Sequence, residues 1–140
     1  MYFSSVGNKP QILRADMDGK NKVVLANLSY IGSTTVDVFL DKPMNRLFFS
    51  DKSNNVIRYV NLINMEIHTI LSGNLHHPTS ITMLNNSLYW TAEGDGTFSG
   101  AIFKAEAAIG STIQMIADGF GYPKGIYAHN ARAPLTPGTR

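Results

Sequence analysis

The chain has no cysteine, few charged residues and no long apolar run, and each of these shortages excludes a class of function. Without cysteine there is no thiol nucleophile, so covalent catalysis would have to use another group. Charged residues make up only 16% of the chain, with a net charge of +2 and no basic cluster, so we expect no nucleic-acid partner. No segment approaches the roughly 20 apolar residues of a membrane span.

Signatures of catalysis and of a secretion leader are missing as well. No serine lies in a Gly-x-Ser-x-Gly turn. The four histidines, His68, His76, His77 and His129, lack the short spacing of metal ligands apart from the adjacent pair. Residues 1–5 have neither the basic segment nor the apolar core of a signal peptide. We therefore predict no enzymatic activity, no cofactor and no metal.

Two loops begin like ligand-binding motifs without completing them. Asp16-Met17-Asp18-Gly19 opens like a calcium loop, but the remaining ligands and the closing Glu are missing, so a hairpin turn is favoured. The Gly-rich stretch 93–100 lacks the Lys-Ser or Lys-Thr pair of a phosphate-binding loop. It predicts an extended hairpin tip.

What the sequence does contain is a repeated aromatic segment. Leu88-Tyr89-Trp90-Thr91 has counterparts at residues 47–51 and 1–5, with an aromatic residue at the second position each time. Large aromatic and β-branched residues favour strands. The copies are roughly 40–45 residues apart, a period typical of propeller blades.

Further apolar segments accompany each copy. Residues 12–15 and 102–105 share an apolar–apolar–cation–small pattern, and apolar runs at 36–40, 79–83 and 125–128 are the expected inner strands. Turn residues separate these segments. The sequence therefore predicts an all-β fold of about three four-stranded antiparallel blades.

These residues resemble a known family. Met1-Tyr2-Phe3, followed by Lys9-Pro10-Gln11-Ile12, is similar to the class B (Tyr-Trp-Thr-Asp) repeats of the low-density-lipoprotein receptor and related proteins. The stretch from His77-Pro78 into Leu88-Tyr89-Trp90-Thr91 resembles the joint between the fifth and sixth blades of that six-bladed propeller. The resemblance implies a partial propeller, blades four to six, over nearly everything up to about His129.

The expected domain is a partial propeller at 1–129, with repeats at about 1–45, 46–86 and 87–129 and a linker or irregular tail at 130–140. Six blades need roughly twice the 140 residues present, so we expect a fragment. The remainder of the propeller, or a second copy, would close the ring. For a fragment, the missing leader says nothing about the full protein.

The blade signature is incomplete, and its residues depart from the family at several positions. Only Asp51 remains of the family's closing aspartates, which help to tie neighbouring blades, because Ser5 and Ala92 occupy the other two positions. Asp37 stands where the family usually has glycine before an inner strand. The signature residues are Tyr2, Phe3, Phe48, Phe49, Asp51, Tyr89, Trp90 and Thr91. Phenylalanine at two of the tryptophan positions keeps the apolar bulk without the indole donor.

The resemblance implies a non-enzymatic ligand-binding module of a cell-surface endocytic or signalling receptor. Its partners would be protein ligands and neighbouring EGF-like and ligand-binding repeats. His77 matches a receptor histidine involved in acid-triggered release, while Asn55 replaces the second histidine of that device. Imidazole titrates in the endosomal range, although a plain solvated loop histidine is the alternative. Lys52, Glu93 and Asp95 follow aromatic strands and are expected on the same face.

Other functions stay open on the sequence. One is a secreted matrix or basement-membrane adaptor with the same propeller, and another is a calcium-dependent propeller hydrolase. Sequons begin at Asn27 and Asn85, both at expected turns, and fit N-glycosylation of an extracellular protein. About one sequon is expected by chance at this length, so they agree with secretion without establishing it.

Overall fold

A computed structural model of the chain describes residues 1–130, apart from the side chains of residues 31, 35 and 36. It contains three antiparallel sheets, in each of which every strand pairs with the next one along the chain. Blade 1 comprises β1 (Tyr2–Ser5), β2 (Gln11–Arg14) and β3 (Val23–Asn27). Blade 2 comprises β4 (Thr35–Asp41), β5 (Arg46–Asp51), β6 (Val56–Asn61) and β7 (Ile67–Leu71). Blade 3 comprises β8 (Pro78–Leu84), β9 (Ser87–Ala92), β10 (Gly100–Glu106) and β11 (Gln114–Phe120).

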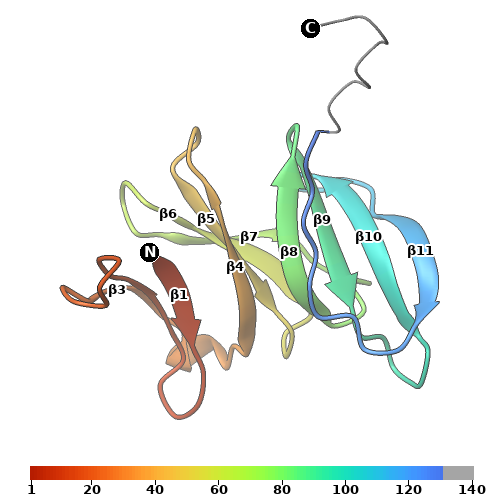
Figure 1. Cartoon of the computed structure of the whole chain (residues 1–140), viewed down its shortest axis with the longest axis horizontal. Helices are drawn as coiled ribbons and strands as arrows, with labels where there is room; N and C mark the ends of the chain where they lie inside the picture. Colours follow the sequence, from red (N-terminus) through yellow and green to blue (C-terminus); the bar gives the residue numbers. More distant parts are fainter. Residues whose placement is uncertain (131–140) are drawn as a thin grey trace, which may run out of the picture.

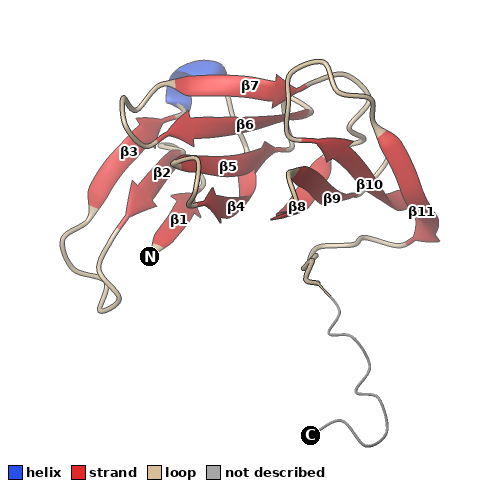
Figure 2. Ribbon diagram, turned by 90° about the horizontal axis from the view of Figure 1, so that it is seen from above, coloured by secondary structure: helices blue, strands red, loops and turns tan. Residues whose placement is uncertain are grey.

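The three blades stand side by side in chain order (Figure 1). Viewed from above, they open like a fan, with β1, β4 and β8 on the inside and β3, β7 and β11 on the outside (Figure 2). A short 3₁₀ turn, η1 (Ser29–Ile31), joins blade 1 to blade 2. The predicted all-β fold of about three antiparallel blades is confirmed, with three strands rather than four in blade 1.

The repeated aromatic segments occupy equivalent strands. They form β1, β5 and β9, and each of these pairs with the following strand of its blade. The second-position aromatics face equivalent partners, with Cα pairs Tyr2–Arg14, Phe48–Tyr59 and Tyr89–Lys104. The period read from the sequence is therefore a structural repeat.

Asparagine-rich turns join several strands. β8 and β9 pair from Leu84 and Ser87, which leaves a two-residue turn at Asn85 and Asn86. Both asparagines have positive φ (50° and 62°), as a type I′ turn requires, and this turn matches the twist of the strands it joins. The predicted turn at residues 16–19 also forms, since the Gly19 amide donates to the Asp16 carbonyl over 3.0 Å.

Two apolar cores hold the blades together. Adjacent side chains of a strand point to opposite faces, so Phe48 packs between blades 2 and 3 while Phe49 packs between blades 1 and 2. Both rings are fully buried, as is Trp90 on the blade 3 side of its core. The Trp90 indole N–H donates to the Leu75 carbonyl over 3.3 Å, which satisfies its buried polar atom.

A carboxylate on the innermost strand of blade 2 ties it to blade 3. Asp37 Oδ2 accepts hydrogen bonds from the Ser80 hydroxyl (2.7 Å) and the Ile81 amide (3.0 Å) of β8. The Ser50 hydroxyl adds a third bond, to the Thr79 carbonyl over 3.1 Å. Asp37 therefore takes part in a blade-to-blade contact at a position where the family usually has glycine.

The strand predicted at 125–128 does not form. This segment runs beside β8 (Figure 1), but it meets β8 through side-chain hydroxyls. The Thr79 hydroxyl donates to the Pro123 carbonyl over 2.7 Å, and the Ile126 amide donates to the Ser80 hydroxyl over 3.2 Å. Bonds to hydroxyls replace the backbone ladder that defines a strand. The predicted linker lies outside the described residues except for Asn130.

We expect Asp37→Ala to lower the free energy of unfolding by about 2–3 kcal/mol, because the Ser80 hydroxyl and the Ile81 amide lose their acceptor. Urea denaturation followed by circular dichroism measures the change. The control is Asp18→Ala, on an exposed turn, which should change stability by less than about 0.5 kcal/mol. Equal effects of the two variants would contradict the role assigned to Asp37.

A second expectation concerns the tryptophan. Trp90→Phe keeps most of the apolar bulk but leaves the buried Leu75 carbonyl without its indole donor. The free energy of unfolding should fall by about 1–3 kcal/mol in the same measurement. An unchanged urea midpoint would show that the indole hydrogen bond contributes nothing.

Candidate functional site

Three loops meet at one end of blades 2 and 3. They follow β5, precede β8 and follow β9, and an antiparallel meander brings these three strand ends to the same edge. Lys52, His77, Glu93 and Asp95 lie on these loops. We call these four residues the loop face.

Direct contacts connect the four residues of the loop face. The Lys52 ammonium lies 2.6 Å from the Glu93 carboxylate, and His77 Nε2 lies 3.0 Å from Asp95 Oδ1. His77 Nδ1 lies 3.4 Å from the Lys52 carbonyl oxygen, which joins the two pairs. The structure thus brings together all four residues that the sequence singled out, while their role stays a prediction.

Hydrogen bonds to neighbouring loops hold the His77 backbone in place. The His77 amide donates to Asn55 Oδ1 over 2.8 Å, and Asn55 Nδ2 donates to the Gly73 carbonyl over 3.0 Å. His76 and His77 both have positive φ (58° and 62°), a conformation that residues other than glycine rarely adopt. Asn55, which replaces the family's second histidine, therefore anchors the loop that carries the first.

The His77 ring faces an acceptor on each side. One neighbour is a backbone carbonyl and the other a carboxylate, and neither can donate. A neutral imidazole carries a single N–H and can donate to only one of them, whereas the protonated ring can donate to both.

The ion pairs of the loop face are open to solvent. The exposed side-chain fractions are 36% for Lys52, 19% for Glu93 and 81% for Asp95. Exposed ion pairs contribute at most about 1 kcal/mol to stability and are screened by salt. These charges can therefore exchange partners without disturbing the sheets beneath them.

Asp51 supports the loop after β5. This fully buried carboxylate accepts bonds from the Ser53 hydroxyl (3.1 Å), the Asn54 amide (3.2 Å) and the Arg58 guanidinium (3.1 Å). The family resemblance implied that it ties neighbouring blades, but these bonds stay within blade 2. At the end of β5 the turn amides are its nearest donors, and the described tie to blade 3 comes from Asp37 and Ser50.

The other predicted residues lie apart from the loop face. The signature aromatics fill β1, β5 and β9, and the Thr91 hydroxyl lies 2.9 Å from that of Thr79. The sequon asparagines are both exposed, Asn27 at the end of β3 and Asn85 in the β8–β9 turn.

The described residues show no metal site and no membrane-spanning helix. Within 1–130, no three acidic or histidine side chains group closely enough to hold a metal ion. Asp16 and Asp18, which open like a calcium loop, instead accept hydrogen bonds from the Asn21 side-chain Nδ2 (2.6 Å) and the Lys20 backbone amide (3.0 Å). In the same part of the chain, no helix has the length and apolar character to cross a bilayer.

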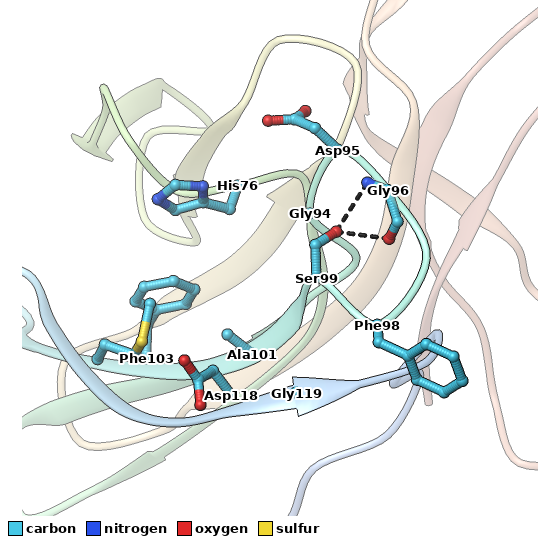
Figure 3. A pocket seen from close by; sticks show the side chains of 11 residues that line it. His76, Gly94, Asp95, Gly96, Phe98, Ser99, Ala101, Phe103, Asp118 and Gly119 are labelled. Atoms are coloured by element: carbon cyan, nitrogen blue, oxygen red, sulfur yellow. Dashed lines mark hydrogen bonds between the residues drawn. The ribbon is translucent and has the colours of Figure 1, made fainter.

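Sequence reasoning missed a hollow beside the loop face. Figure 3 shows it between the 94–99 loop, His76 and strands β10 and β11, with Asp95 on its rim. Its volume is about 440 Å³. The Gly-rich stretch and the adjacent histidines pointed to the region, but the contribution of Asp118 from β11 had no signal in the sequence.

Comparison with known proteins finds similar stretches in two receptors. No family model matches it. It is 33% identical to the vitellogenin receptor of Solenopsis invicta over 91 residues, 65% of this chain. It is also 33% identical to low-density lipoprotein receptor-related protein 5 of Homo sapiens over 85 residues, 61% of this chain. The matches cover 5% of the length of each receptor.

A solved structure shares the fold. The crystal structure of a nidogen/laminin complex contains a chain that superposes with a TM-score of 0.72 at 18% identity, over 89% of this chain and 47% of that one. At this identity the likeness concerns the fold alone. In sequence and in fold, the chain thus resembles the class B repeat propellers of the low-density-lipoprotein-receptor-related proteins.

Proposed function

We propose that the chain is part of a non-enzymatic, ligand-binding propeller in the extracellular portion of a cell-surface receptor. The observation that carries this proposal is the convergence of Lys52, His77, Glu93 and Asp95 from three loops of two blades. The receptor relatives support the setting. The rest of the ring and any EGF-like or ligand-binding repeats would come from other parts of the protein.

The loop face suits a protein ligand. Its loops rest on packed sheets, so their positions change little while the charged tips stay accessible. It carries both signs of charge, and each charge already has an exchangeable partner. A ligand with complementary charges can replace these contacts. The charges would then orient the ligand and raise its association rate.

Acid conditions would weaken such a complex through His77. Protonation lets the ring donate to the Lys52 carbonyl and to Asp95 together. Asp95 is then held by the imidazolium and is less available to a ligand. Because imidazole titrates between neutral and endosomal pH, the loop face would release its ligand on acidification.

Reversing a charge tests the loop face. Peptides selected at neutral pH from a displayed library on the immobilised wild-type chain should lose binding to Lys52→Glu, since the variant places a second carboxylate beside Glu93. The free energy of unfolding should change by no more than about 1 kcal/mol, because the pair is partly exposed. Biolayer interferometry and urea denaturation measure the two effects.

Lys42→Glu is the matched control for that charge reversal. Lys42 is an exposed lysine of the β4–β5 hairpin, at the opposite end of blade 2. The selected peptides should bind this variant as they bind the wild type. If they bind Lys52→Glu equally well, the loop face is not the docking site.

Replacing the ring tests acid release. His77→Gln keeps a polar side chain that does not titrate, so peptide binding should become nearly independent of pH between 7.4 and 5.5. The wild type should lose about tenfold in affinity over the same interval. His68→Gln, at a partly exposed histidine of β7, is the control and should follow the wild type. If peptide binding by His77→Gln still depended on pH, a titratable group other than His77 would be responsible.

A further inference from the structure

The hollow beside the loop face has a rigid aromatic floor. The His76 ring stacks on Phe103 with centroids 5.1 Å apart and planes 4° apart, and Phe103 stacks on Trp90 at 5.6 Å and 18°. Phe103 and Trp90 belong to the buried core between blades 2 and 3. The floor of the hollow is therefore continuous with the core and cannot collapse easily.

The loop that walls the hollow is held by its own hydrogen bonds. The Ser99 hydroxyl accepts from the Gly96 amide (2.7 Å) and donates to the Gly96 carbonyl (2.5 Å), as the dashed lines in Figure 3 show. The Gly94 amide donates to the His76 carbonyl over 3.0 Å. Gly94 has φ of 71°, and a Cβ there would collide with Ser99, so only glycine allows this path. The hollow is thus preformed.

The charges around the hollow are both negative. The Asp118 carboxylate lies beside Ala101 and Phe103, and the Asp95 carboxylate lies at the opposite rim (Figure 3). Both side chains are exposed, and no lysine or arginine is among the residues that line the hollow. The Met115 thioether adds a further apolar surface.

We propose that this hollow binds an arginine side chain of a protein partner. A guanidinium can stack on the His76 ring, which Phe103 supports from below, lay its aliphatic stem against Met115 and donate to Asp118 or Asp95. The site extends beyond the proposed loop face, because Asp118, Phe103 and His76 are not part of that face.

Other occupants fit less well. An anion would be repelled by the two carboxylates. An apolar side chain would displace water from these carboxylates without forming hydrogen bonds in its place. A calcium ion needs six to eight oxygen ligands, far more than two aspartates supply. A lysine offers charge without the planar face that the aromatic stack can receive.

The test uses N-acetyl-L-arginine amide as the probe and amide chemical shifts of the full 140-residue chain as the readout. Saturable shifts should appear at Gly94, Gly96, Gly119 and Phe103, and they should weaken as ionic strength rises. N-acetyl-L-citrulline amide, which has nearly the same shape without the charge, should leave these amides unchanged. Equal shifts with citrulline, or shifts elsewhere only, would overturn the proposal.

Matched variants separate this site from the loop face. Asp118→Asn should weaken arginine-amide binding about two- to fivefold, whereas Asp18→Asn, which removes the same charge from a distant exposed turn, should not. Lys52→Glu should retain the arginine site even if it abolishes docking at the loop face. Wild-type affinity in Asp118→Asn, or a lysine amide that binds as tightly as arginine, would overturn the assignment. The overall spectrum of each variant shows that it is folded.

Discussion

Burial of neighbouring aromatic residues on opposite faces of one strand is the contact on which the structure depends. Phe48 and Phe49 of β5 are both fully buried, one in each core, so a single dipeptide joins three sheets. The free energy comes chiefly from removing this apolar surface from water, since burying a ring of this size contributes about 1.5–3 kcal/mol. Polar ties such as Asp37–Ser80 then set the position of one sheet against the next.

The loop face and the hollow are consequences of this packing. The loop face takes its residues from loops of both blade 2 and blade 3, so the distance between Lys52 and Glu93 is set by the core beneath them. The hollow has the same origin, because Phe103 reaches it from β10 while its ring belongs to the shared core. The loop face needs two blades, whereas the hollow is lined by blade 3 and by His76 of the segment that leads into it.

Features that repeat along the chain could be predicted from sequence. Aromatic segments that recur after roughly 40–45 residues predicted the blades, and the residues after two of them, together with His77 from the family resemblance, predicted the loop face. Features that depend on contacts between distant residues could not. Asp37 and Ser80 are 43 positions apart, and neither residue type signals its partner. Likewise, nothing in the sequence around Asp118 shows that it would turn toward His76.

The segment beyond β11 shows that the surroundings of a segment, as well as its own residues, decide whether it forms a strand. It was predicted to be a strand because it is an apolar run at the place of an inner strand, yet its backbone meets the hydroxyls of Thr79 and Ser80 and forms no ladder. The residue pattern of a segment indicates that it is extended. Its contacts with the edge strand beside it decide whether it becomes part of that sheet.

His76 and His77, which both have positive φ, connect the loop face with the hollow. The two rings leave the chain at consecutive positions, one toward the Phe103 stack and the other toward Asp95. A rotation of this dipeptide would move both rings at once, so a change in its backbone at the loop face would also alter the hollow.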